Sequence, residues 1–477
     1  MSGYSALTVI VAVCLATPIQ VQAQTQTHKV PWHETTAALG LAKTLPEGTL
    51  SQTQLNALTA IGESLFTAKF TTKDGAGRPG ATQAIIPTAP RNRATQNFAR
   101  TSGPDANACS SCHNDPAPGG AGDFVANVFA SEGFSNTDFD TTDPQFSNER
   151  GTNHIFGAGL VELLAREMSH DLNHLRDTAL KDARGQKKPV RVALKTKGVD
   201  FGHLTAMPDG LVDLGEIDGV DSDLIVRPFT QKGVMTSLRQ FTINAMNQHH
   251  GMQASERFGR RWTGTDDFDG DDIPAEMSPA DISALVAWQA TLPPPVTQTP
   301  DDPRWQKAAA RGQTLMAEFG CTICHRPSLP LHTLSFSDPG PFDAAGTLNA
   351  SQVKAPADYD LGGFDWAARL PRDENGAVLV PVFGDLKRHK MTDRSIESLG
   401  NELFSQRFVD RNIFMTAELW GVGSTAPYGH RNDFTTLDEI ILAHGGDARS
   451  SRDHYDKAAA ADRSALIAFL RTLRITP

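Results

Sequence analysis

The sequence contains the same short pattern twice, a Cys-x-x-Cys pair followed directly by His. The first copy occupies residues 109–113 in NACSSCHND, and the second occupies residues 321–325 in FGCTICHRP. Cys14 is the fifth cysteine, so four of the five lie in this one pattern. The fold must therefore build two separate regions around these two turns of chain.

Two cysteines at this spacing can each form a thioether bond to one vinyl group of a haem, and the next histidine then lies under the iron. A zinc site needs four ligands, so the two copies would have to share one ion and their histidines would stay unexplained. A thioredoxin-like redox pair needs a different fold and no following histidine. The pattern predicts two covalently bound haem c groups, with the proximal iron ligands His113 and His325 and the thioether residues Cys109, Cys112, Cys321 and Cys324.

The N-terminus is typical of a secretory signal peptide. An apolar run from Ala6 to Ala16 leads to a small-residue cleavage pattern that ends at Ala23, although no lysine or arginine precedes the run. The run is too short to span a bilayer, and we expect no membrane span elsewhere. We expect residues 1–23 to be removed and the mature protein to be periplasmic, which leaves every remaining cysteine in a haem motif. A buried N-terminal helix is the alternative.

Both halves of the chain follow the same order. IGESLFTAKF around Gly62 and RGQTLMAEFG around Gly312 predict an opening helix before each motif, and SPADISALVAWQATL and ADRSALIAFLRTL predict the closing helices. A proline-rich polar stretch separates the halves. The fold class that we expect is mainly α, with two cytochrome c-like haem domains, long irregular loops and few short strands. The expected boundaries are a signal peptide at 1–23, an N-terminal haem domain with insertions at 24–293, a linker at 294–305 and a C-terminal haem domain at 306–477.

The segment TTLDEIILAHGG predicts a helix that is capped by Thr436 and Glu439 and ends at Gly445. His444 falls on the apolar face of this helix, where a histidine is usually a core residue. The second haem must be covered by residues of its own half of the chain. We therefore expect His444 to be the second ligand of that iron, with His430 as the alternative.

The first haem has fewer candidate ligands, because no histidine lies between His113 and His154. NQHHGMQ places His249 and His250 at the end of a stretch with helical apolar spacing. Adjacent histidines point in different directions on a helix, so at most one of them is expected to face the haem. A polar helix end is an equally good interpretation of this pair.

The segment TDDFDGDDIPAE gathers alternate aspartates around a glycine, a pattern that suits a Ca²⁺ ion. It predicts a calcium site at Asp267, Asp269 and Asp271. EF-hand spacing would place a glycine where Asp272 stands, so an acidic surface loop is the alternative.

The formal net charge of -11 argues against nucleic acid or an anionic membrane surface as a partner. The same charge favours a basic redox protein. We expect a small electron donor, such as a mono-haem cytochrome or a cupredoxin.

With these motifs, the chain resembles the di-haem cytochrome c peroxidase superfamily. It is most similar to the di-haem oxidoreductase or "thiol oxidoreductase" branch, to which the haem-containing rubber oxygenases are also similar. Beside the two Cys-x-x-Cys-His motifs, the resemblance rests on HIFGAGLVE, VRPF and LWGVGSTAPYGHRNDFTTLDEIILAHGG. Arg431 and Asn432 replace the family's Asp-Gly in the last of these segments.

The resemblance implies roles for particular positions. The peroxidases have a Met ligand where this chain has His444, which implies a bis-His haem of lower potential, as in the rubber oxygenases. The peroxidase loop histidine that caps the resting first haem has no counterpart here, which implies an open first haem. Gly251 stands at the position of the peroxidases' catalytic Glu, so His249 or His250 is implied as the acid–base group. Gln231 replaces the Trp that bridges the two haems.

Three functions are compatible with these residues. The first is a peroxidase-like oxidoreductase, in which hydrogen peroxide reacts at the open N-terminal haem, His249 or His250 transfers protons, and the C-terminal haem relays electrons. The second is an oxygenase of the rubber-oxygenase type that uses dioxygen. The third is a non-catalytic electron-transfer cytochrome, which is favoured if His249 or His250 ligates the first iron. The breadth of the resemblance places the peroxidase-like function first.

Overall fold

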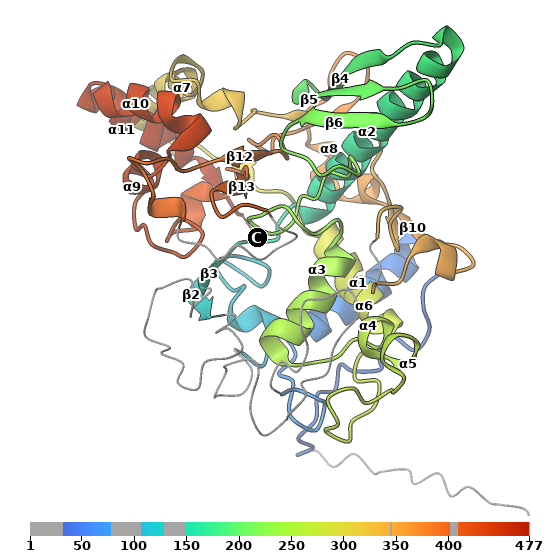
Figure 1. The fold of residues 1–477 in the computed structure, drawn as a ribbon. Helices are drawn as coiled ribbons and strands as arrows, with labels where there is room; N and C mark the ends of the chain where they lie inside the picture. Colours follow the sequence, from blue (N-terminus) through green and yellow to red (C-terminus); the bar gives the residue numbers. More distant parts are fainter. Residues whose placement is uncertain (1–31, 78–105, 128–148, 344–345, 401–408, 477) are drawn as a thin grey trace, which may run out of the picture. The chain divides into compact units, whose positions relative to one another are not determined.

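The computed structural model describes residues 32–77, 106–127, 149–343, 346–400 and 409–476. The chain divides into two compact units, residues 1–34 and 35–477. The helices and strands described here belong to the second unit (Figure 1). The expected signal peptide, residues 1–23, lies outside the described residues.

Helices α1 (Gln52–Thr67) and α6 (Pro279–Thr291) lie where the opening and closing helices of the first half were predicted. Helix α6 begins with the capping box expected at Ser278. The two helices pack at Gly62, where a Cβ atom would lie 2.0 Å from the carbonyl oxygen of Ala284. A residue with a side chain would force the helices apart, so this glycine permits the close crossing.

The second half repeats this arrangement with α7 (Pro303–Glu318) and α11 (Ala460–Leu470), which pack against each other. A Cβ atom on Gly312 would lie 2.1 Å from the carbonyl oxygen of Ala465. Figure 1 shows yellow α7 beside the red C-terminal helices. Each half therefore contains a pair of helices that cross closely at a glycine.

The other helices differ widely in length, and α2 is the longest at 29 residues. No helix in the described part of the chain combines the length and the apolar character needed to cross a membrane. The other α-helices are α2 (Ala158–Gln186), α3 (Leu238–Ala245), α4 (Ser255–Phe258), α5 (Arg260–Thr263), α8 (Asp365–Ala368), α9 (Leu437–Leu442) and α10 (Arg449–Lys457). The π-helix is η2 (Met246–His250), and the 3-10 helices are η1 (Cys109–Ser111), η3 (Cys321–Ile323), η4 (Ala350–Gln352), η5 (Leu361–Gly363), η6 (Ser398–Gly400), η7 (Val422–Ser424) and η8 (Gly446–Ala448).

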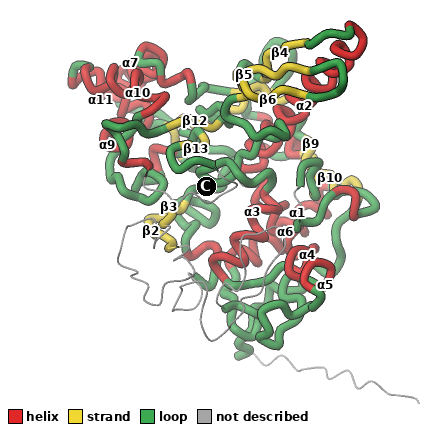
Figure 2. The backbone as a smooth tube through the Cα atoms, in the orientation of Figure 1, coloured by secondary structure: helices red, strands yellow, loops and turns green. Residues whose placement is uncertain are grey.

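The described residues contain several small sheets beside the helices, so the mainly α fold class was wrong (Figure 2). The three-stranded sheets are β1-β10-β9, from Gly48–Thr49, Ala357–Asp360 and Ser335–Asp338, and β4-β5-β6, from Val190–Thr196, Val199–Ala206 and Val212–Ile217. The strand pairs are β2 (Gly122–Asn127) with β3 (Glu149–Thr152), β7 (Val296–Thr297) with β14 (Leu473–Arg474), β8 (Leu329–Leu331) with β11 (Val378–Val380), and β12 (Arg388–Lys390) with β13 (Ile413–Met415).

The hairpin of β4 and β5 shows why the prediction failed. Its strands, VRVALKT and VDFGHLTA, alternate apolar and polar residues, which is typical of a sheet with one buried face. The two residues between the strands, Lys197 and Gly198, have φ angles of 48° and 79°, as a two-residue hairpin turn requires. The predicted fold class was based on the helical motifs at the two ends of each half, and the alternation in these two segments was not taken into account.

Most buried apolar side chains of the described residues belong to two cores. The larger core combines α1, α2, α3 and α6 with residues of segment 329–386, including Phe336 and Val380, although this segment follows the second motif in the sequence. The smaller core joins α7 to the C-terminal helices, for example through Leu315 and Phe469. Residues 294–305, the expected linker, contain β7 and the first turn of α7.

Candidate haem sites

The two Cys-x-x-Cys-His motifs adopt the same backbone conformation. Each begins with a 3-10 helix, η1 in the first motif and η3 in the second. The amide N–H of the histidine donates to the carbonyl oxygen of the first cysteine, at 3.0 Å from His113 to Cys109 and 2.9 Å from His325 to Cys321. The four motif cysteines form no disulfide bonds. Each turn thus presents two thiols and one imidazole, the groups that covalent haem attachment uses.

His113 is held by its Nδ1 atom, which donates a hydrogen bond to the carbonyl oxygen of Gly120 at 3.3 Å. A carbonyl oxygen only accepts, so the proton is on Nδ1 and the lone pair is on Nε2. Burial, together with the charge of His249, lowers the pKa of His113 to about 4. His113 is therefore neutral at pH 7, in the tautomer that iron-ligating histidines adopt when a carbonyl orients them.

His325 and His444 are oriented in the same way. Nδ1 of His325 donates to the carbonyl oxygen of Phe383 at 3.2 Å, and Nδ1 of His444 donates to that of Ile440 at 2.7 Å. Burial lowers the pKa of both imidazoles, to about 4 for His325. Both rings are thus neutral, with their Nε2 lone pairs available to a metal.

The rings of His325 and His444 are 6.5 Å apart between centres, with an interplanar angle of 58°. A metal–imidazole bond is about 2.0–2.1 Å long, so two imidazoles on opposite sides of one metal ion have ring centres roughly 6 to 6.5 Å apart. The observed separation fits an iron held between the two histidines.

A cavity of about 530 Å³ is bordered by His113 from the first motif and His325 from the second. The hydroxyl of Thr230, in the cavity wall, is buried and has no hydrogen-bond partner among the described atoms. Its backbone has a φ of 69°, which is unusual for a β-branched residue and is found where surrounding structure imposes it. A hydroxyl in this position suits a carboxylate of a haem. The thiols, the neutral imidazoles and the adjoining cavity therefore fit haem as the bound group.

Residues 367–473 match the family described as "Di-haem oxidoreductase, putative peroxidase". This part of the chain is therefore similar to the di-haem oxidoreductases. The matched residues include His389, His430 and His444, whereas both Cys-x-x-Cys-His motifs precede them. The resemblance to the di-haem peroxidase superfamily is thus confirmed by a part of the chain that lies outside its two motifs.

Solved structures give weaker likenesses. The chain is similar to Kuenenia stuttgartiensis hydrazine synthase, in a structure pressurised with xenon, at 12% identity and a TM-score of 0.37, over 98% of this chain and 100% of that chain. It is also similar to a MauG-like protein associated with microbial copper homeostasis, at 16% identity and a TM-score of 0.26, over 56% of this chain and 77% of that chain. Scores this low carry no argument about fold or function. No curated protein matches the chain.

We call the surroundings of residues 109–113 the first haem site and those of residues 321–325 the second. At the first haem site, α3 continues into the π-helix η2, a rare element that is frequent at functional sites. His249 in this π-helix borders the 530 Å³ cavity and also a smaller cavity of about 80 Å³ that lies against Cys109 and Cys112. It is therefore placed beside the region that His113 borders.

His250 has different surroundings from its neighbour. It is 3% exposed, and its Nδ1 donates to the carbonyl oxygen of Ala106 at 2.6 Å. Its Nε2 atom lies 3.5 Å from Sγ of Cys109. Both ring nitrogens thus have partners at the edge of the first motif, whereas His249 borders the larger cavity.

His430, the alternative ligand, stacks on Phe414 with ring centres 3.9 Å apart and an interplanar angle of 12°. Burial, together with the charge of Lys232, holds the pKa of His430 well below its usual value. Its carbonyl oxygen accepts a hydrogen bond from the amide of Gly151 in β3. His430 therefore joins the two halves in the cavity wall, while the ring paired with His325 is that of His444.

The expected calcium ligands lie together. Oxygen atoms of Asp267, Asp269 and Asp271 are within 4.8 Å of one another. Burial, followed by the charges of Asp271 and Asp267, raises the pKa of Asp269 to about 6. Glu276 is 8% exposed and interacts with the same three charges, and burial is the main cause that raises its pKa to about 9. Bringing these carboxylates together is costly, and a bound cation would offset that cost.

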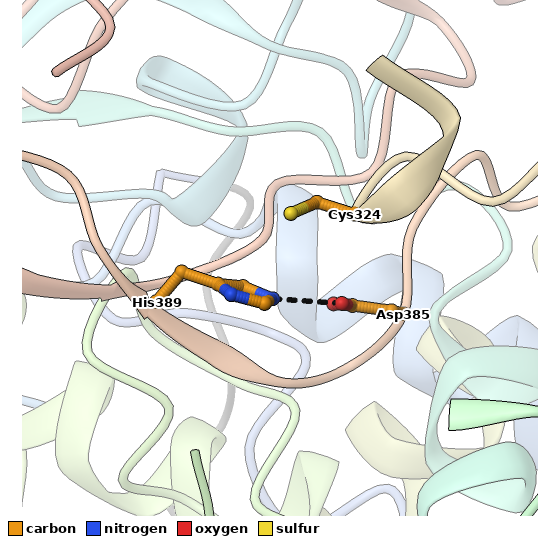
Figure 3. Close-up of side chains that lie close together, drawn as sticks. All are labelled: Cys324, Asp385 and His389. Carbon is orange, nitrogen blue, oxygen red and sulfur yellow. Dashed lines mark hydrogen bonds and ion pairs between the residues drawn. The ribbon is translucent and has the colours of Figure 1, made fainter. Parts of the chain in front are cut away.

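A charged pair at the second haem site was missed from the sequence. Nε2 of His389 and Oδ2 of Asp385 are 2.7 Å apart, and both side chains are largely buried. Figure 3 shows the pair beside the sulfur of Cys324, which comes within 4.8 Å of both. The two residues flank the start of strand β12, so no helix periodicity or known motif signals their contact.

Proposed function

We propose that the protein is a periplasmic di-haem c-type oxidoreductase with peroxidase-like chemistry. The first haem site is the reaction site, and the second is an electron relay. One observation carries this proposal: the rings of His325 and His444 are spaced to close both sides of one iron, at 6.5 Å. At the first site, the corresponding space beside His113 belongs to a cavity that His249 borders.

At the first site, Cys109 and Cys112 would hold the haem through thioether bonds, and the imidazole of His113 would hold its iron. The bound haem supplies the redox chemistry that reduces peroxide. A ring nitrogen of His249 takes a proton from one peroxide oxygen and returns it to the other, which leaves as water. Reduction of hydrogen peroxide to two waters consumes two protons and two electrons, and the electrons enter through the second site.

At the second site, Cys321 and Cys324 would provide the thioether bonds, and the imidazoles of His325 and His444 would hold the iron. A haem held by both imidazoles would supply electron transfer. Helix α9 positions His444 through a capping box at Thr436. A relay of this kind needs ligands that stay in place when the charge of the iron changes.

Low-temperature EPR of the ferric protein, combined with mass spectrometry of haem peptides, tests the proposal. We expect covalent haem on both motif peptides, one high-spin and one low-spin signal, and a change of the high-spin signal on adding peroxide. In His444→Ala, the low-spin signal should become high-spin. Two low-spin signals that peroxide leaves unchanged would contradict an open first site.

The second candidate is a non-catalytic electron-transfer cytochrome. It is favoured because His113 and His249 border the same cavities, as they would if both approached the same iron. In that case, wild-type protein would give two low-spin signals, and His249→Ala would convert one to high-spin. Consumption of dioxygen without peroxide turnover would instead favour an oxygenase of the rubber-oxygenase type.

Export is proposed from the signal-peptide pattern of residues 1–23. N-terminal sequencing of protein isolated from the periplasm should begin at Gln24. Full-length protein retained in the cytoplasm would contradict export.

The proposed electron donor is a small basic cytochrome or cupredoxin, because the chain carries a net charge of -11. The rate of reduction by such a donor should fall steeply as salt is added. A rate that does not depend on salt would contradict electrostatic recognition.

Calcium is proposed at Asp267, Asp269 and Asp271 because their oxygens lie within 4.8 Å of one another. Adding Ca²⁺ to chelator-treated protein should raise the Tm, and Asp269→Asn should abolish the increase. The exposed Asp209→Asn is the control and should keep it. A Tm that is the same with and without Ca²⁺ would contradict this site.

A further inference from the structure

The buried pair of Asp385 and His389 lies against the sulfur of Cys324 (Figure 3). We propose that the two charges of this pair balance each other beside the second haem, so that loss of either one shifts the reduction potential of that haem and changes how readily the site accepts and passes on electrons. The inference rests on the proposed function, because it requires a haem attached at residues 321–325.

One turn of chain positions both the pair and the iron ligand. The carbonyl oxygen of Phe383 accepts the Nδ1 hydrogen bond of His325 at 3.2 Å, and Asp385 follows two residues later. Phe383 and Leu386 have φ angles of 48° and 53°, a conformation that non-glycine residues rarely adopt. Such strain persists where the surroundings hold the backbone in place, and both side chains are buried here.

The neighbouring cations of this turn are engaged elsewhere. Lys387 donates to Asp218 at 2.5 Å, and Arg388 pairs with Asp221. His389 is the cationic partner of Asp385, because a carboxylate that is only 2% exposed requires a close opposite charge. The pair therefore brings one negative and one positive charge to the haem attachment point.

Another acidic side chain, Glu418, lines the same cavity as His389. Burial, and then the charge of Asp385, raises the pKa of Glu418 to about 7. Glu418 is thus only partly charged at neutral pH. The principal charges beside Cys324 remain those of Asp385 and His389.

The physical effect of the pair follows from the charge of iron. Ferric haem carries one more positive charge than ferrous haem, so a nearby negative charge favours the oxidised state and a positive charge favours the reduced state. The opposite charges of Asp385 and His389 largely cancel. Removal of one leaves the other uncompensated, and a unit charge about 10 Å away at an effective dielectric constant of about 20 changes such an equilibrium roughly ten-fold.

Spectroelectrochemical titration of the holo-protein tests the inference. His389→Gln should lower the ratio of reduced to oxidised second haem about ten-fold at a given potential, which equals 59 mV for a one-electron couple. Asp385→Asn should raise that ratio by a similar factor. The double variant should lie close to wild type, and the first haem of the same molecules should not shift.

His332→Gln is the matched control, since it removes another histidine–carboxylate contact, 3.0 Å from Glu167, at a ring that is 71% exposed. This variant should leave the reduction potentials of both haems unchanged. His389→Lys restores a positive charge and should return the second potential toward the wild-type value. A shift in His389→Lys as large as that in His389→Gln would overturn the inference.

The two single variants also separate an electrostatic role from a structural one. Disruption of packing would shift the potential of the second haem in the same direction in His389→Gln and in Asp385→Asn. Shifts of the same sign in the two variants, or no shift in either, would therefore overturn the inference. Absence of haem from the 321–325 peptide of the wild-type protein would instead contradict the proposed function.

Discussion

The two haem sites share one motif but differ in what lies opposite the motif histidine. At the second site, His325 is paired with His444, and each imidazole is oriented by a backbone carbonyl. At the first site, His113 has the same carbonyl-held tautomer, and a π-helix brings His249 to the wall of the adjoining cavity. The motif therefore fixes one histidine at each candidate site, and the rest of the fold decides what lies opposite that histidine.

In the proposed function, this difference separates the reaction site from the electron relay. A histidine on a helix end that is fixed by a capping box and a carbonyl has little freedom, as a permanent ligand requires. In the proposed function, the histidine on the π-helix at the edge of the cavity acts on the substrate instead. Substitutions that alter one site and leave the other intact test this difference.

The largest effect is expected when a proximal ligand is removed. His113→Ala should reduce peroxide turnover by on the order of 10³-fold or more, because the reacting iron loses its protein ligand. His325→Ala should stop electron delivery but preserve the change in the spectrum that peroxide causes at the first haem. Stopped-flow spectroscopy of both variants, with mass spectrometry as a control for haem attachment, measures this. Loss of the peroxide-induced change in both would show that the sites are not specialised.

Replacing His249 should have the next largest effect. His249→Gln keeps the size of the side chain but removes the proton carrier, so peroxide turnover should fall about 10²–10⁴-fold. His250→Gln is the control, because both its ring nitrogens have partners outside the larger cavity. A greater loss of peroxide turnover in His250→Gln than in His249→Gln would show that His250 is the proton carrier.

Substitutions at the two helix crossings, Gly62 and Gly312, compare how much each crossing contributes to the stability of the protein. Gly62→Ala and Gly312→Ala should each destabilise the protein by about 1–3 kcal/mol, because the new Cβ meets a backbone carbonyl at 2.0 and 2.1 Å. Denaturant unfolding measures the loss. Gly185→Ala in α2, where nothing lies within 4 Å of the new Cβ, should instead be neutral or stabilising by up to about 1 kcal/mol. Unchanged stability in both crossing variants would mean that the helices separate without cost.

The smallest effect is expected at the helix caps. Thr436→Ala and Ser51→Ala each remove the side-chain acceptor of a capping box and should cost about 1 kcal/mol. Only Thr436→Ala should also broaden the low-spin EPR signal, because its helix positions His444. An unchanged EPR signal would show that the carbonyl of Ile440 alone is sufficient to orient this ligand.

The sequence predicted the elements whose signals are local. The capping boxes at Ser278 and Thr436 and the helices that cross at Gly62 and Gly312 lie where their residues indicated. Strands were underestimated because several are only two to four residues long and their pairing is decided by distant segments, as when β1 (Gly48–Thr49) pairs with β10 (Ala357–Asp360). Short strands have no periodicity that distinguishes them from loops.

The sequence alone determined the two Cys-x-x-Cys-His motifs and the helices around them, because side-chain spacing and capping signals within a few residues specify them. The tertiary structure decided which groups meet across the cavity. It brought the ring centres of His444 and His325 to 6.5 Å from each other. It also gave His249 and His250 different surroundings and placed Asp385 and His389 beside the sulfur of Cys324. These contacts depend on the packing of segments far apart in the chain, whose burial stabilises the fold as a whole and leaves no local pattern in the sequence.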